Sequence, residues 1–170
     1  MSSSKKNLSD HDEVPSGKGF HIHIVVSDWN TDITSKLLSG AKETLLSAGI
    51  EESTIEIVHV PGAFELPVAA KSILKAVSTD SVICLGCVIK GDTAHDEYIN
   101  NAVATGLTQL SIVSGKPIIF GVLTVNDQQQ AEDRAGGKHG NKGVEAAITA
   151  IKMVTIQKQL GKPKSTIGFS

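Results

Sequence analysis

The chain has 170 residues, 40% of them hydrophobic and 20% charged, and a formal net charge of −2 at pH 7. This length suits one domain with one core and is too short for two independent cores. The near-zero charge gives no reason to expect nucleic acid or an anionic membrane as a partner. The longest apolar runs, such as 22–26, are far too short to cross a bilayer.

The first nineteen residues are polar and lack the apolar segment of a secretory signal. Three of them are acidic, which argues against an organelle transit peptide. We therefore expect a flexible arm at residues 1–19, one α/β domain at 20–160, a frayed tail at 161–170 and a cytoplasmic location.

Strand-like and helix-like segments alternate along the rest of the chain, which predicts a parallel sheet covered by helices. In chain order the first elements are a strand at 20–27, a helix from a cap at Asn30 or Thr31 to Gly49, a strand at 53–60, and a helix from about Glu65. They are followed by a strand at 81–89, a helix closed by Gly115, a strand at 116–124, a short polar helix from Asp127 to Gly136, and a last helix at 141–160.

The run SVICLGCVI (81–89) is apolar throughout, which is typical of a central strand buried on both faces. The whole pattern predicts a small doubly wound, flavodoxin-like α/β sheet of four parallel strands with helices on both faces. Ligands bind such sheets beyond the carboxyl ends of the strands. That rule selects four loops: SDWN (27–30), VPGAFE (60–65), KGDTAH (90–95) and VNDQQ (125–129).

Cys84 and Cys87 form a CxxC motif, which suggests a redox pair or a metal site. Both lie inside the apolar strand, where residues three apart face opposite sides, so we expect two buried, unpaired thiols. A deaminase-like zinc site would need the CxxC pair downstream of HDE (95–97), and the HExxH pattern is absent. We therefore expect no metal.

The loop KGDTAH carries the residues most suited to chemistry. Asp92, Thr93 and the acidic pair after His95 suit a helix N-terminus, whose free amides also bind anions. His95 is the one side chain here that exchanges a proton near neutral pH. Capping alone accounts for the acidic residues, and a structural role for His95 stays open at this point.

The stretch AEDRAGGKHGNKGVEA (131–146) places four glycines and three cationic residues between two helices. It is not a phosphate-binding P-loop, since GNKGV has no Ser or Thr after its lysine and no strand before it. It either brings Arg134 and Lys142 toward an anion or forms a solvated glycine-rich turn.

Three more side chains have two interpretations each. Trp29, the only tryptophan, either stacks on a flat heterocycle or shields the sheet edge. Glu65 either begins a helix or accepts hydrogen bonds from a ligand's hydroxyls. Phe120 lies inside an apolar strand, where a core position is commoner than one that faces a ligand.

Five motifs in order, SDWN, VPGAFELP, CVIKGDTAHDEY, KPIIFGVLT and RAGGKHGNKG, resemble those of the 6,7-dimethyl-8-ribityllumazine synthase family of riboflavin biosynthesis. The resemblance runs from about residue 20 to residue 153. It implies an enzyme without metal or organic cofactor. Such an enzyme would condense 5-amino-6-(D-ribitylamino)uracil with 3,4-dihydroxy-2-butanone 4-phosphate and release phosphate and water.

The resemblance also implies roles for individual residues. His95 would transfer protons, while Asp92, Thr93 and Arg134 would bind the phosphate of the ketone. The residues that would bind the ribitylaminouracil are Trp29, Ala63, Phe64, Glu65, Cys87, Val88, Ile89 and Phe120.

Family members are pentamers, and some build sixty-subunit shells, so the resemblance implies a homo-oligomer with active sites shared between subunits. Phe120, Arg134 and Lys142 would come from the adjacent subunit, and riboflavin synthase is a candidate partner. Two alternatives are a non-catalytic flavin or lumazine carrier on the same scaffold and a response-regulator-like domain. The second is disfavoured, because Ser27-Asp28 and Ile89-Lys90 stand where such a domain needs an acidic cluster and a phosphoacceptor aspartate.

Overall fold

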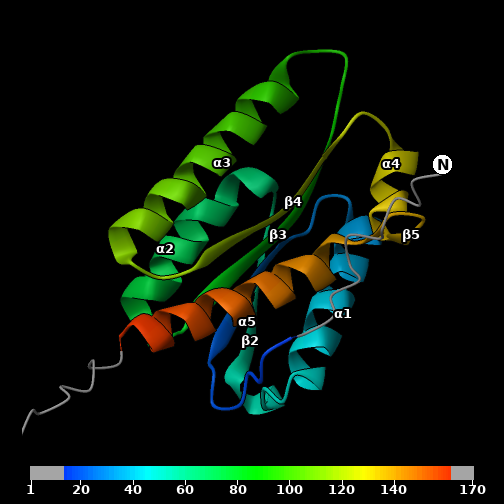
Figure 1. Ribbon diagram of the computed structural model, residues 1–170. Coiled ribbons are helices and arrows are strands. Elements are labelled where there is room, and N and C mark those ends of the chain that lie inside the picture. Colours follow the sequence, from blue (N-terminus) through cyan, green and yellow to red (C-terminus); the bar gives the residue numbers. More distant parts are fainter. Residues whose placement is uncertain (1–13, 162–170) are drawn as a thin grey trace, which may run out of the picture.

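Four parallel strands form the central sheet, in the order β2-β1-β3-β4, in a computed structural model that describes residues 14–161 (Figure 1). The strands are β1 (Ile22–Ser27), β2 (Ile55–Val60), β3 (Ser81–Ile89) and β4 (Ile118–Val125). This confirms the predicted α/β fold class and strand number. Three strands begin two residues later than predicted. At β1 the reason is that the His21 amide donates to the Asp80 carboxylate (2.8 Å) instead of entering the ladder.

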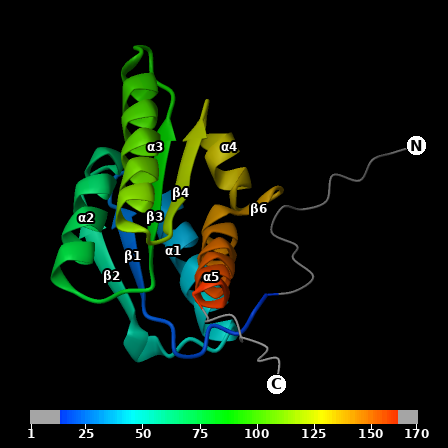
Figure 2. The same cartoon turned by 60° about the vertical axis from the view of Figure 1, so that its left-hand side comes forward.

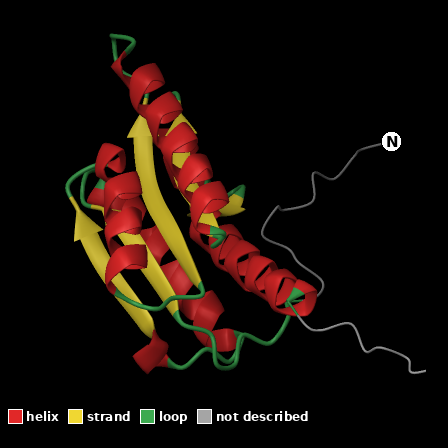
Figure 3. Cartoon of the chain, turned by 90° about the vertical axis from the view of Figure 1, so that its left-hand side faces the viewer, coloured by secondary structure: helices red, strands yellow, loops and turns green. Residues whose placement is uncertain are grey.

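Helices cover both faces of the sheet, as predicted (Figures 2 and 3). Residues of α1 (Thr31–Ser47), α4 (Gln128–Asp133) and α5 (Lys142–Leu160) pack with the strands in one apolar cluster. Residues of α2 (Leu66–Ala76) and α3 (His95–Ser114) pack on the opposite face in a second cluster. The alternation of side chains along each strand divides the core between these two faces.

The strand β3 shows this alternation directly. Cys84 belongs to the cluster under α2 and α3, whereas Cys87 belongs to the cluster under α1 and α5. Both thiols are free, as predicted. Burial raises the pKa of Cys84 to about 12, and burial together with the charge of Asp32 raises that of Cys87 to about 11. Two thiols that face apart and resist ionisation do not form a redox pair.

The start of α1 lies where the sequence predicted it, but the expected side-chain cap is wrong. Asn30 is the N-cap residue with φ of 59°, and its side chain makes no capping bond. Its Nδ2 instead donates to the carbonyl oxygen of Cys87 (2.9 Å), while the Thr31 hydroxyl donates to the Asp28 carbonyl. The backbone carbonyl of Asn30 accepts from the amides of Ile33 and Thr34. Asn30 therefore joins the β1–α1 loop to the end of β3.

The glycine-rich segment contains an element that was not predicted. Its two short strands, β5 (Ala135–Gly137) and β6 (Gly140–Asn141), form an antiparallel hairpin between α4 and α5. Gly136 and Gly140 have φ of 105° and 82°, which side-chain-bearing residues rarely adopt. The hairpin is therefore built on glycine conformations rather than on residues with strand propensity.

Most of the expected arm at 1–19 and nearly all of the tail at 161–170 lie outside the described residues. Within the described part of the arm, the Gly17 amide donates to the Ala48 carbonyl at the end of α1 (2.8 Å). In the part of the chain from Val14 to Gly161, no helix combines the length and apolarity needed to span a membrane.

Candidate active site

A pocket of about 430 Å³ opens at the carboxyl ends of β1, β2 and β3, next to the first turn of α3. The side chains that line it are Trp29, Phe64, Glu65, His95, Tyr98 and Ile99. Three of the four loops selected from the sequence supply this lining. The pocket thus combines aromatic surface with one carboxylate and one imidazole, which suits a flat polar ligand.

Trp29 is held against the second loop. Its amide donates to the Pro61 carbonyl (3.0 Å), and a Cβ added to Gly62 would lie 2.6 Å from Cε3 of the indole. One side of the ring therefore contacts the backbone at Gly62. Because the side chain is 64% exposed, the indole also presents surface on which a heterocycle can stack.

Glu65 combines the two roles that the sequence left open. The turn Ala63–Glu65 precedes α2, and Oε2 of Glu65 accepts from the Gly62 amide (3.1 Å) in a capping box. The other oxygen, Oε1, has no hydrogen-bond partner within residues 14–161, and the Glu65 side chain lines the pocket. One carboxylate oxygen therefore fixes the turn, and the other is available to hydroxyl donors of a ligand.

His95 is the first residue of α3 and lines the same pocket as Trp29 and Glu65. Its amide makes a long hydrogen bond to the Thr93 hydroxyl (3.4 Å), and the residues before it are exposed. The N-cap, Ala94, provides no side-chain bond to the helix amides. An imidazole able to exchange protons therefore lies next to the positive end of a twenty-residue helix.

The end of β3 extends beyond its pairing with β1. Pairing between β1 and β3 ends at Val26 and Leu85, whereas β3 continues to Ile89 along β4. The β1-facing groups beyond Leu85 are therefore outside the ladder, and Asn30 Nδ2 occupies one of them, the Cys87 carbonyl. Cys87, Val88 and Ile89 are paired in register with Leu123, Thr124 and Val125 of β4 and have no partner on β1.

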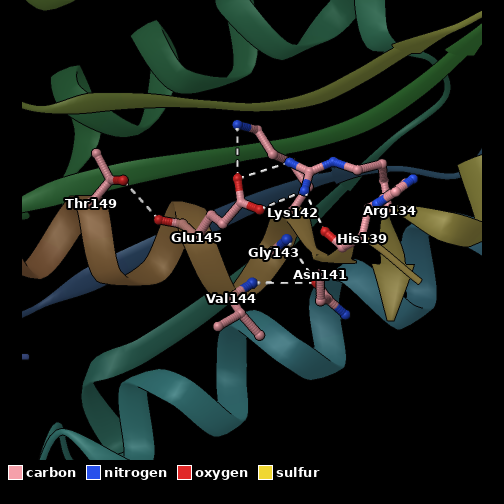
Figure 4. Close-up of polar contacts among 8 residues, drawn as sticks. All are labelled: Arg134, His139, Asn141, Lys142, Gly143, Val144, Glu145 and Thr149. Carbon is pink, nitrogen blue, oxygen red and sulfur yellow. Dashed lines mark hydrogen bonds and ion pairs between the residues drawn. The ribbon is translucent and has the colours of Figure 1, made fainter. Parts of the chain in front are cut away.

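Of the predicted residues, only Trp29, Phe64, Glu65 and His95 line this pocket in a single protomer. The predicted residues that do not line it are Ala63, Cys87, Val88, Ile89, Asp92, Thr93, Phe120, Arg134 and Lys142. Phe120 is half-buried against the cluster beneath α2 and α3. Arg134 and Lys142 lie on the opposite face, where both contact the Glu145 carboxylate (Figure 4). The distances from Glu145 Oε2 are 2.9 Å to Arg134 Nη2 and 3.4 Å to Lys142 Nζ.

Glu145 was missed in the sequence, where the only signal was a carboxylate three residues after Lys142. Burial opposes its ionisation, but the hydrogen bond and charge of Arg134, together with Lys142, hold the pKa of Glu145 below its ordinary value. Within residues 14–161, no three His, Cys, Asp or Glu side chains are grouped to hold a metal ion.

The fold and site define a flavodoxin-like α/β protein with a pocket at the carboxyl edge of the sheet, lined by aromatic side chains, one carboxylate and one imidazole. The chain matches the profile of 6,7-dimethyl-8-ribityllumazine synthase over residues 19–158. It therefore belongs to the 6,7-dimethyl-8-ribityllumazine synthase family, whose members are transferases of riboflavin biosynthesis.

Proteins carrying the family's name are similar to the chain over almost their whole length. One from Cytophaga hutchinsonii is 51% identical over 91% of this chain and 98% of its own. One from Porphyromonas gingivalis is 48% identical over 93% of this chain and 99% of its own, and one from Parabacteroides distasonis is 48% identical over 91% and 98%. The resemblance stated from the motifs is thus confirmed.

Proposed function

We propose that the protein condenses 5-amino-6-(D-ribitylamino)uracil with 3,4-dihydroxy-2-butanone 4-phosphate to 6,7-dimethyl-8-ribityllumazine, releasing phosphate and water. The single observation that carries this proposal is the joint placement of Trp29, Glu65 and His95 in one pocket. Membership of the family supplies the substrates, and the pocket supplies the surfaces that these substrates need.

In the pyrimidine half of the site, the uracil ring stacks on Trp29, and the backbone of Cys87, Val88 and Ile89 binds its polar edge. The turn of Ala63, Phe64 and Glu65 holds the ribityl chain, with Glu65 Oε1 accepting from its hydroxyls. The end of the β1–β3 ladder at Leu85 and the place of Glu65 in the pocket lining support these assignments.

In the phosphate half, the exposed backbone at Asp92 and Thr93, just before α3, binds the ketone's phosphate. Asp92 takes part through its amide, since its carboxylate would repel the anion. Arg134 of an adjacent subunit supplies a cation, with Lys142 beside it. The position of this backbone at the N-terminus of α3, where the N-cap Ala94 supplies no side-chain bond, supports the position of the anion.

The reaction forms an imine, eliminates phosphate and closes a ring, and each step moves protons without needing a protein nucleophile. Holding both substrates in one pocket supplies much of the acceleration. His95 passes protons between reacting groups, and the cationic half stabilises the departing phosphate. No step calls for a metal or an organic cofactor.

The proposal includes a homo-oligomer, specifically a pentamer, with Phe120, Arg134 and Lys142 completing a neighbour's pocket. Apolar side chains on the outer surface of α2 and α3, Val68, Ile112 and Val113, are exposed in the isolated protomer and support assembly there. Light scattering of the purified protein separates pentamer from sixty-subunit shell. A cytoplasmic location and an association with riboflavin synthase complete the proposal, and cell fractionation and co-purification test them.

The decisive experiment mixes the purified protein with both substrates and follows the lumazine chromophore by absorbance. We expect product formation that saturates in each substrate. A carrier on the same scaffold would bind riboflavin and quench Trp29 fluorescence but would form no product. Binding without turnover would therefore overturn the proposed function.

A further inference from the structure

One carboxylate lies between the two cations of the hairpin region (Figure 4). Arg134 pairs with both oxygens of Glu145, through Nη1 to Oε1 (2.8 Å) and Nη2 to Oε2 (2.9 Å). Lys142 Nζ lies 3.4 Å from Oε2. Two positive charges and one negative charge leave the cluster with a net charge of +1.

The backbone brings the two cations together before any side-chain contact forms. The Lys142 amide donates to the Arg134 carbonyl (2.9 Å), and the β5–β6 hairpin spans the residues between them. Arg134 Nη1 also donates to the His139 carbonyl inside that hairpin (2.6 Å). Glu145 follows on the first turn of α5, which Asn141 caps through the Gly143 amide (2.8 Å).

The three side chains are sheltered but still reachable from solvent. The exposed fractions are 20% for Arg134, 29% for Lys142 and 12% for Glu145. Ion pairs at this depth are screened less by salt than fully exposed ones. The Lys142 contact is longer than the roughly 2.7–2.9 Å of a strong charge-assisted hydrogen bond, so this ammonium is the less firmly held of the two cations.

We propose that Glu145 is a positioning residue for the phosphate half of the site: it orders Arg134 and Lys142 before substrate arrives, and its own charge weakens their hold on phosphate. The inference rests on the proposed role of Arg134 in phosphate binding. The carboxylate stands in for an anion in the resting enzyme, and phosphate binding exchanges part of the Arg134 contact with Glu145 for a contact with phosphate. Release of product phosphate returns the guanidinium to the carboxylate.

This proposal and a purely structural ion pair predict opposite changes in phosphate affinity when the charge of Glu145 is removed. If Glu145 only supported Arg134, neutralising it would loosen the guanidinium and weaken phosphate binding. If Glu145 also opposes the bound anion, neutralising it removes a repulsion between two negative groups in one small site. Phosphate then binds more tightly.

The test uses Glu145→Gln in the full-length oligomer, with inorganic phosphate as the probe in titration calorimetry. Glutamine keeps the shape and one acceptor oxygen for Arg134 while removing the charge. We expect the phosphate Kd to fall about three- to tenfold. In kinetics, the KM for the phosphorylated ketone falls and inhibition by phosphate strengthens, while the KM for the pyrimidine stays the same.

Glu52→Gln is the matched control. Glu52 also pairs with a lysine, Lys42 (2.7 Å), but in the short turn before β2. Glu52→Gln removes the same charge at a site outside the cation cluster, so the phosphate Kd of this variant should equal that of the wild type. A similar tightening in both variants would assign the effect to net charge and overturn the proposal.

An unchanged or weaker phosphate affinity in Glu145→Gln overturns the proposal, and so does a wild-type protein that does not bind phosphate. If Glu145→Gln does not fold, Glu145→Asp is measured instead. Its shorter side chain moves the negative charge away from the phosphate site, so the phosphate Kd should fall about twofold. An unchanged phosphate Kd contradicts the proposal. Failure of the proposed function is separate: it appears as absent lumazine synthesis, whatever the phosphate affinities.

Discussion

The indole of Trp29 lies against the backbone of Gly62, so closely that a methyl group at Gly62 would sit 2.6 Å from Cε3 and 2.7 Å from Cζ3 of the ring. The same methyl group would lie 3.1 Å from Oε2 of Glu65. Only the lack of a side chain at position 62 therefore lets both the indole and the Glu65 carboxylate lie where they do in the pocket.

Gly62→Ala should displace both groups at once. We expect the affinity for the pyrimidine substrate to fall about tenfold or more, since ångström-scale misplacement in a site is costly. The single tryptophan makes the change visible as a shift in intrinsic fluorescence and as weaker quenching by riboflavin.

Gly91→Ala is the fluorescence control for that experiment. It lies in the loop before His95, but a Cβ there would meet no atom within 4 Å. Its tryptophan emission should match the wild type. Wild-type quenching in Gly62→Ala would show that the Gly62 contact does not position the indole.

The hydrogen bond from Asn30 to the Cys87 carbonyl is expected to contribute to stability. Asn30→Ala loses this bond, worth about 1 kcal/mol, and places alanine at φ of 59°, which costs about 1 kcal/mol more. Asn30→Gly loses only the bond, because glycine tolerates the backbone conformation. Urea unfolding should therefore rank the wild type first, Asn30→Gly second and Asn30→Ala last. Equal stabilities for the two variants would contradict a strained backbone at this position.

The two cysteines should be unreactive toward thiol reagents at neutral pH. Only the thiolate reacts, and burial has raised the pKa of Cys87 to about 11 and that of Cys84 to about 12. The reactive fraction therefore grows only as pH rises toward these values, with Cys87 first. A disulfide-exchange reagent should label neither thiol in the folded protein at pH 7.5 and both in guanidinium. Fast labelling of the native protein, or a disulfide between the two cysteines, would contradict the assigned burial.

The position of the pocket could be predicted from the sequence, because ligands bind such sheets beyond the carboxyl ends of the strands and these ends follow from the order of strands and helices. Trp29, Glu65 and His95 each follow a recognisable strand, so their loops must gather at the same edge. The pairing of Asn30 with the Cys87 carbonyl was not predictable, since the two residues are 57 positions apart and asparagine at a helix start usually caps it.

Glu145 was missed for a different physical reason. Its principal partner, Arg134, is brought close by a hairpin that contains Gly136, Gly137 and Gly140, and glycine has little strand propensity. The sharing of Phe120, Arg134 and Lys142 between subunits remains a prediction, and none of the three lines the pocket of its own protomer.

The most direct test of the account compares lumazine formation by the wild type and by His95→Ala, with the pyrimidine Kd measured for both. Losing an acid–base group should lower kcat by about 100-fold or more, while the pyrimidine Kd changes less than about threefold because the proposed contacts of Trp29 and Glu65 with the ligand are kept. Wild-type turnover in His95→Ala would contradict proton transfer by this imidazole.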